Sequence, residues 1–234
     1  MDASSYALVH GLRSTRGALV EWRGQPWLVL RAWLGWSLAV AVGLLGAIWV
    51  IAALSNPHGS VLLNQPPFVV GDVGDVPRIL GHNLLVLALH AMACVAGFIA
   101  GSSLPLQAEH HRGLMRQIHE RGRPAAMTFV ICATCGSLSL QAHVLGKGVA
   151  EVAATVHRPP GLVLVALLPH ALPELIALFL PLAAWIVAGR RGQWDRLLAA
   201  TLVTVACAVP ILVLASLWEV YAAPHVLGAV LGYR

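Results

Sequence analysis

Long stretches without a charged side chain dominate the hydrophobic and polar pattern of this sequence. Residues 32–54 carry no charge, and further apolar runs follow at about 81–104, 124–146, 161–189 and 197–218. A helix needs about 20 apolar residues to cross the hydrocarbon core of a bilayer. Its backbone polar groups must then be bonded internally, which a helix achieves by itself. The pattern predicts an all-α polytopic transmembrane helical bundle of about five spans, with interfacial or broken short helices.

Two less apolar segments join these runs. Residues 105–123 contain four arginines and two glutamates with a weak apolar stripe at helical spacing. This predicts a short amphipathic helix on the membrane surface, and a solvated loop is the alternative. Residues 147–160 are too few and too polar to span the bilayer. They are expected to form a short helix that lies in the interface or dips into the protein.

The run at 161–189 is interrupted by three prolines. Proline inside a helix removes a hydrogen bond, and its ring clashes with the carbonyl one turn earlier. We therefore expect a short apolar piece at 161–168, a break at 169–172 and a new helix that starts near Pro173. Glu174 would then lie in the first turn of that helix, where the positive helix end favours an acidic side chain.

Composition supports a membrane protein. The chain is 58% hydrophobic and 11% charged, with a mean hydropathy of +0.77, whereas soluble domains carry about 25% charged residues. The net charge of +5 comes from arginines in short loops. Such a distribution sets topology and is not the basic patch of a nucleic-acid-binding protein.

The arginine-rich segments predict the orientation. Residues 1–31 (four Arg, one Asp, one Glu), 105–123 (four Arg, two Glu) and 190–196 (three Arg, one Asp) each carry a net charge of +2. With five spans all three lie on one side, which the positive-inside bias assigns to the cytoplasm. We expect a multi-pass protein of the cell membrane with its N-terminus inside and its C-terminus outside. Residues 1–31 form a cytoplasmic basic segment, and residues 32–234 form one transmembrane domain.

Small residues and cysteines add little chemistry. Ala93, Gly97 and Gly101 recur at four-residue spacing, which places them on one helix face for close packing against another helix, in this chain or in a second copy. Cys132 and Cys135 form a lone C-x-x-C without a second pair. A buried apolar role is favoured over metal or redox chemistry.

Four polar residues stand within or beside the apolar runs. His170 and Glu174 lie in "LLPHALPELIAL" (167–178), Glu219 lies in "SLWEVYAAPH" (216–225), and Asn83 lies in the glycine-containing stretch "HNLLVLALHAMACVAGFIAG" (82–101). Ionisable residues inside a membrane mark substrate or proton pathways by default. The alternative is a structural polar cluster that satisfies the broken backbone. No third residue at a diagnostic spacing completes a metal site.

These three stretches resemble, in order, elements of the stage II sporulation protein M family of membrane proteins, over about residues 80–225. The sequence departs from the family pattern at Ala171, where glycine is usual, and at Ala223, where threonine is common. The resemblance implies an α-helical integral membrane protein without known catalysis. One member is understood as a scaffold for peptidoglycan-degrading partners, and relatives beside ATPase genes are permease-like.

The expected function is that of a non-enzymatic membrane subunit of a multi-protein complex, in scaffolding or transport. The rival is a permease-like subunit, served by a separate ATPase, with a polar site at His170, Glu174 and Glu219. No phosphate-binding loop or catalytic triad pattern is present. We expect neither a cofactor nor a metal ion. Expected partners are the bilayer, other subunits and a second copy, with cytoplasmic docking on Arg112, Arg116 and Arg121.

Overall fold

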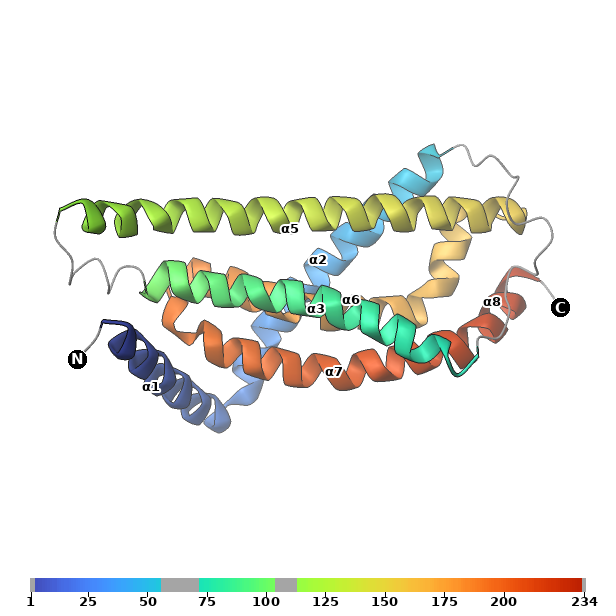
Figure 1. The fold of residues 1–234 in the computed structure, drawn as a ribbon. Helices are drawn as coiled ribbons and strands as arrows, with labels where there is room; N and C mark the ends of the chain where they lie inside the picture. Colours follow the sequence, from blue (N-terminus) through green and yellow to red (C-terminus); the bar gives the residue numbers. More distant parts are fainter. Residues whose placement is uncertain (1–2, 56–71, 104–112, 233–234) are drawn as a thin grey trace. The chain divides into compact units, whose positions relative to one another are not determined.

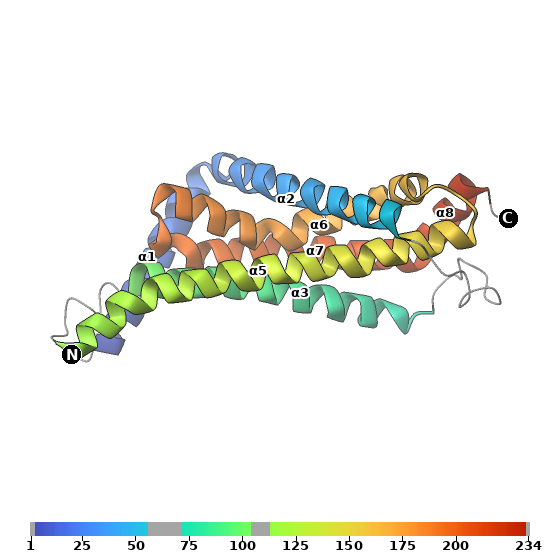
Figure 2. The same cartoon turned by 90° about the horizontal axis from the view of Figure 1, so that it is seen from above.

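This computed structural model describes residues 3–55, 72–103 and 113–232, without the side chains at 3–8, 10, 114–121 and 123. Nearly all of the described residues are helical, and short turns join the helices. Figure 1 and Figure 2 show the helices from two directions. In chain order they are α1 (Ala3–Gly24), α2 (Pro26–Leu54), α3 (Asp75–Phe98), the π-helical turn η1 (Ile99–Ser103), α5 (Leu114–Thr155), α6 (Pro160–Arg191), the 3-10 turn η2 (Trp194–Arg196), α7 (Leu197–Tyr221) and α8 (Ala223–Leu231).

Five segments are long and apolar enough to cross a membrane, which confirms the predicted all-α bundle and fits a multi-pass membrane protein. They are α2, α3 together with η1, the Pro124–Thr155 part of α5, α6, and η2 together with α7. The first span begins at Pro26, before residue 32 where the sequence pattern places its start. Proline is favoured at the first helical position because its missing N–H is not needed there.

The predicted break in the fourth span is wrong. α6 runs without interruption from Pro160 to Arg191, through all three internal prolines. Proline's fixed φ is compatible with a helix, and the chain tolerates the lost hydrogen bonds by bending. Figure 1 shows the first turns of α6 running at an angle to those that follow. Glu174 therefore lies inside a helix and does not lie in its first turn.

The two predicted interfacial segments are also partly wrong. α5 is a single helix from Leu114 to Thr155 that passes through Pro124. The second half of 105–123 therefore forms its beginning and most of 147–160 forms its end, so neither is a separate short helix. Residues 104–112 lie outside the described part of the chain. A continuous helix keeps the backbone hydrogen bonds that a separate surface helix would interrupt at its ends.

The chain divides into two compact units, to which each of the five long helices contributes residues. Unit 1 comprises Met1–Ser37, Val86–Cys135 and Leu178–Ala208. Trp33 is buried there and packs edge-to-face against Trp22, with 5.3 Å between the ring centres. Around it lies the main apolar cluster, formed by Trp33, Leu180, Ala183, Ala184, Val187 and Ala200.

Two glycines, Gly97 in α3 and Gly101 in η1, permit close packing inside unit 1. A Cβ added at Gly97 would lie 2.7 Å from Nε1 of Trp185 and 2.9 Å from a methyl of Leu197. A Cβ at Gly101 would overlap the side chain of Trp194. Ala93, one turn before Gly97, is buried. The small residues of α3 and η1 thus face other parts of the same chain.

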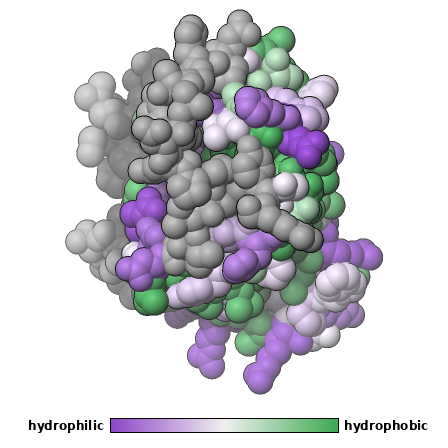
Figure 3. Space-filling model, turned by 90° about the vertical axis from the view of Figure 1, so that its right-hand side faces the viewer, coloured by the Kyte–Doolittle hydropathy of each residue, from purple (hydrophilic) through white to green (hydrophobic). Residues whose placement is uncertain are grey.

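Unit 2 comprises Leu38–Leu85, Gly136–Ala177 and Val209–Arg234. Gly146 of α5 packs against Ile51 of α2, 2.7 Å from the place its Cβ would take. Arg158 donates from Nε to the carbonyl oxygen of Leu231 at 3.2 Å, which ties the end of α8 to the α5–α6 connection. Figure 3 looks onto the side that carries α8, where hydrophilic side chains project among apolar ones.

Candidate functional site

The candidate site gathers polar side chains from three helices of unit 2. Glu174 comes from α6, Glu219 from the last turns of α7, and Asn83 from the third turn of α3. All three helices are apolar spans. Glu174 and Glu219, two of the four polar residues singled out in the sequence, are thus far apart in the chain but belong to the same unit.

Glu174 is the centre of this group. Its side chain is half-buried, and the carboxyl of Glu219 lies close enough for the two charges to act on each other. The Asn83 side chain lies beside the same carboxyl. Like charges repel each other, and the repulsion is stronger where water is scarce.

Asn83 has unused hydrogen-bonding capacity. Its side chain is 5% exposed, and Nδ2 makes no hydrogen bond of normal geometry within the described residues, although the amide lies beside Glu174. A buried amide without a partner carries a cost of about 1–3 kcal/mol. A small adjustment of either side chain would turn this proximity into a hydrogen bond to the carboxylate.

Arg78 belongs to the same group, and the sequence analysis did not single it out. Its charge acts on Glu219, while its guanidinium also contacts Asp75 at 3.0 Å at the start of α3. Arg78 is largely exposed, with 76% of its side chain accessible. The sequence offered one signal for Arg78: it follows Asp75 by three residues at the start of an apolar run. Such a pair is also common at the ends of helices, so it did not indicate a site.

His170 does not join the carboxyls in a ligand cluster. It is half-buried one helical turn before Glu174, on the same side of a continuous α6. Among the described residues, no three His, Cys, Asp or Glu side chains gather where they could hold a metal ion. The arrangement is therefore a pair of acids with an amide and an arginine.

A further buried polar side chain, that of His90, lies in unit 1. His90 of α3 is 2% exposed and packs edge-to-face on Phe179, with 5.3 Å between the ring centres. Neither ring nitrogen makes a hydrogen bond of normal geometry within the described residues. Packing on an aromatic ring gives this histidine an apolar contact in place of a polar partner.

The predicted cytoplasmic docking residues fall outside what the structure describes. Arg112 is not placed, and the side chains of Arg116 and Arg121, although they belong to α5, are not described.

Cys132 and Cys135 are exposed on α5, so the prediction that they are buried is wrong. Comparison of the chain with protein-family models, curated proteins and solved structures finds no match.

Proposed function

We propose that this chain is a non-enzymatic membrane subunit that works in a complex with other proteins, in scaffolding or transport. The supporting observation is the exposure of α5. Only 11% of the residues in its most apolar 18-residue window are buried, against 33–44% in the other four spans. A spanning helix that its own chain covers so little is available to contact a neighbouring subunit.

The uncovered side of α5 has the chemistry of a helix contact. Thr128, Cys132 and Cys135 are exposed and spaced four and three residues apart, so they share one face. Beside them, a Cβ added at Gly136 would meet nothing within 4 Å. Small and hydroxyl-bearing residues are enriched where membrane helices pack together. A face that only contacted lipid would gain more from large apolar side chains.

The decisive experiment compares two glycines. Gly136→Leu adds bulk to the uncovered face of α5, and Gly43→Leu adds the same bulk to an equally open position of α2. A Cβ at either position meets nothing within 4 Å among the described residues. After purification in mild detergent, Gly136→Leu should release the co-purifying subunit and lower the mass of the complex. The proposal fails if both variants keep the parent's mass and partners.

A second copy of the chain is one candidate for the neighbour. Cys132 and Cys135 are free and exposed on the same face. If two copies meet there, mild oxidation in membranes should give a covalent dimer that disappears in the double Cys→Ala variant. A different subunit at this face would give a cross-linked product of another mass.

We further propose that the N-terminus is cytoplasmic and that Arg112, Arg116 and Arg121 contact a soluble partner such as an ATPase. Reversal of all three to Glu should release that partner and leave the bundle folded. A co-purified set that stays the same would contradict the docking role. The resemblance to the stage II sporulation protein M family supports the same class of function and itself stays a prediction.

The second candidate function is a permease-like subunit, and the paired carboxyls support it. Glu174 and Glu219 belong to two spanning helices and influence each other electrostatically, and the Asn83 amide beside Glu174 has an Nδ2 group without a hydrogen bond among the described residues. Such a pair is suited to bind a proton or a small cation during transport. The test is ion or proton uptake into vesicles that contain the purified complex. Uptake that Glu174→Gln leaves unchanged would exclude this role.

A further inference from the structure

A cavity in unit 1 is separate from the polar cluster described above. It has a volume of about 530 Å³ and lies where the end of α1, the start of α2, the end of α6 and the start of α7 come together. Ligand pockets in proteins usually measure about 300–1,000 Å³. The space is thus large enough for the headgroup and upper chain of a lipid.

The floor of the cavity is apolar. Trp22, Val29 and Trp33 line it from α1 and α2, and Val187 and Ala200 line it from α6 and α7. The two indoles stand at right angles to each other. Tryptophan is favoured at the level of lipid headgroups, because its ring is apolar and its N–H is polar.

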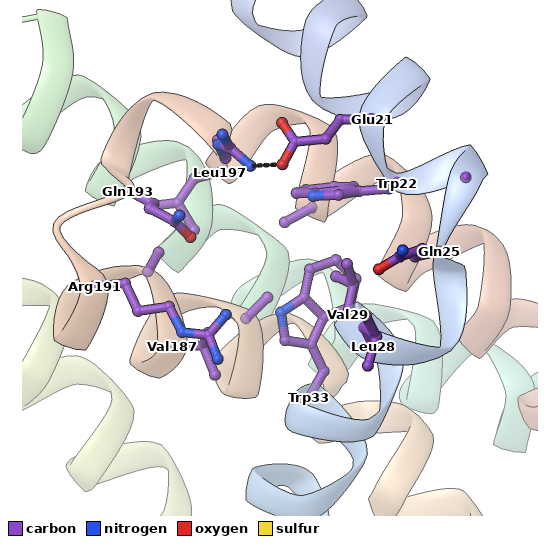
Figure 4. A pocket seen from close by; sticks show the side chains of 15 residues that line it. Glu21, Trp22, Gln25, Leu28, Val29, Trp33, Val187, Arg191, Gln193 and Leu197 are labelled. Carbon is purple, nitrogen blue, oxygen red and sulfur yellow. Dashed lines mark hydrogen bonds and ion pairs between the residues drawn. The ribbon is translucent and has the colours of Figure 1, made fainter.

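The rim of the cavity is polar and basic. Arg191, Arg196 and Glu21 line it together with Gln25 and Gln193. Figure 4 shows Arg191 and Gln25 reaching toward the cavity from opposite sides. Arg196 contacts Glu21 at 2.9 Å, so this pair is neutral overall. Arg191 is exposed and has no ion-pair partner among the described residues, and it therefore leaves the rim with a net positive charge.

The rim also lies at the polar ends of the spans. α2 starts at Pro26, α6 ends at Arg191, and the last span starts at Trp194. Headgroup phosphates occupy this level of a bilayer, with acyl chains toward the apolar floor. Basic pockets between membrane helices bind anionic headgroups through charge and hydrogen bonds. We propose that this cavity binds one anionic phospholipid, with its phosphate on Arg191 and its upper acyl chain over Trp33.

The lipid is favoured over a soluble anion because the floor is apolar. A free phosphate would use Arg191 and leave the indoles and aliphatic side chains exposed to water. A zwitterionic lipid would fill the floor, but its cationic group would approach Arg191. The chemistry of rim and floor together fits an anionic amphiphile.

The test uses the delipidated full chain and native mass spectrometry. Titration with phosphatidylglycerol should show one tightly bound lipid, and phosphatidylcholine should bind more weakly. Arg191→Gln should weaken phosphatidylglycerol binding by about five-fold, because one basic side chain near a membrane surface contributes about 1 kcal/mol. Arg16→Gln, which removes a charge from exposed α1 outside the cavity, is the matched control.

A second pair of variants tests the cavity without changing charge. A Cβ at Gly24, which lines the cavity, or at Gly17, which does not, would meet nothing within 4 Å. Gly24→Phe should reduce lipid binding, and Gly17→Phe should leave it unchanged. Glycerol 3-phosphate at the same concentration should not displace the lipid. Equal binding by Arg191→Gln and the parent, equal effects of the two phenylalanines, or displacement by glycerol 3-phosphate would overturn the proposal.

Discussion

Gly97 of α3 lies against the indole of Trp185 on α6, where a Cβ on the glycine would be 2.7 Å from Nε1. Nearby, the thiol of Cys94 donates to the carbonyl oxygen of Pro181 at 3.0 Å. Both contacts join α3 to α6 within unit 1. Close approach of two helices therefore depends on a residue without a side chain at position 97.

Gly97→Ala should destabilise the protein by about 1–3 kcal/mol, the usual cost of added bulk in a packed interior. Gly101→Ala should cost at least as much, because its new methyl would lie 2.6 Å from Cβ of Trp194, an atom that cannot rotate away. Gly43→Ala meets open space and should be neutral or slightly stabilising, since alanine favours helices. Thermal unfolding in detergent measures all three. Equal melting temperatures would contradict the close packing.

Substitutions of Glu174 separate a structural from a functional acid. If the cluster is structural, Glu174→Gln should keep most activity because the amide still forms hydrogen bonds, and Glu174→Leu should destabilise the fold by leaving polar neighbours unpaired. If the acid binds a proton or cation, Glu174→Gln should abolish activity and keep the melting temperature. Complex formation or uptake, measured beside thermal stability, distinguishes the two outcomes.

The membrane orientation can be tested with single cysteines in a background without the four native ones. A membrane-impermeant maleimide added outside should label Asp72→Cys in the loop before α3. It should not label Arg190→Cys at the end of α6, because three arginines in 190–196 favour the cytoplasm. Permeabilised cells provide the positive control for the second site. Labelling of residue 190 in intact cells would reverse the proposed topology.

Arg158 should hold α8 in place. Loss of its hydrogen bond to the Leu231 carbonyl oxygen in Arg158→Ala is expected to cost about 1 kcal/mol. The effect should be local to α8, because the hydrogen bond joins Arg158 to the end of that helix. Hydrogen exchange of the α8 amides should become faster, while Lys147→Ala, an exposed change on α5, should leave it as it was. An unchanged exchange rate in Arg158→Ala would show that apolar packing alone holds α8.

The sequence by itself determined the fold class and the spans. The sequence has five apolar runs long enough to cross a bilayer. In the hydrocarbon core their backbone N–H and C=O groups can form hydrogen bonds only within helices. It also indicated which polar residues are candidates for a functional site, since Glu174 and Glu219 stand out in an apolar chain. Their spacing of 45 positions said nothing of whether they meet.

Only the tertiary structure decided which polar groups act together. It put Asn83 beside Glu174, Glu219 within electrostatic reach of Glu174, and Arg78 within electrostatic reach of Glu219, because the packing of α3, α6 and α7 fixes which helix faces meet. It also kept α6 helical through Pro169 and Pro173, since tertiary packing stabilises a bent helix that local preference would interrupt. The cavity lined by Arg191, Trp22 and Trp33 arises from segments far apart in sequence. No local pattern encodes it, because its walls exist only when those helix ends pack together.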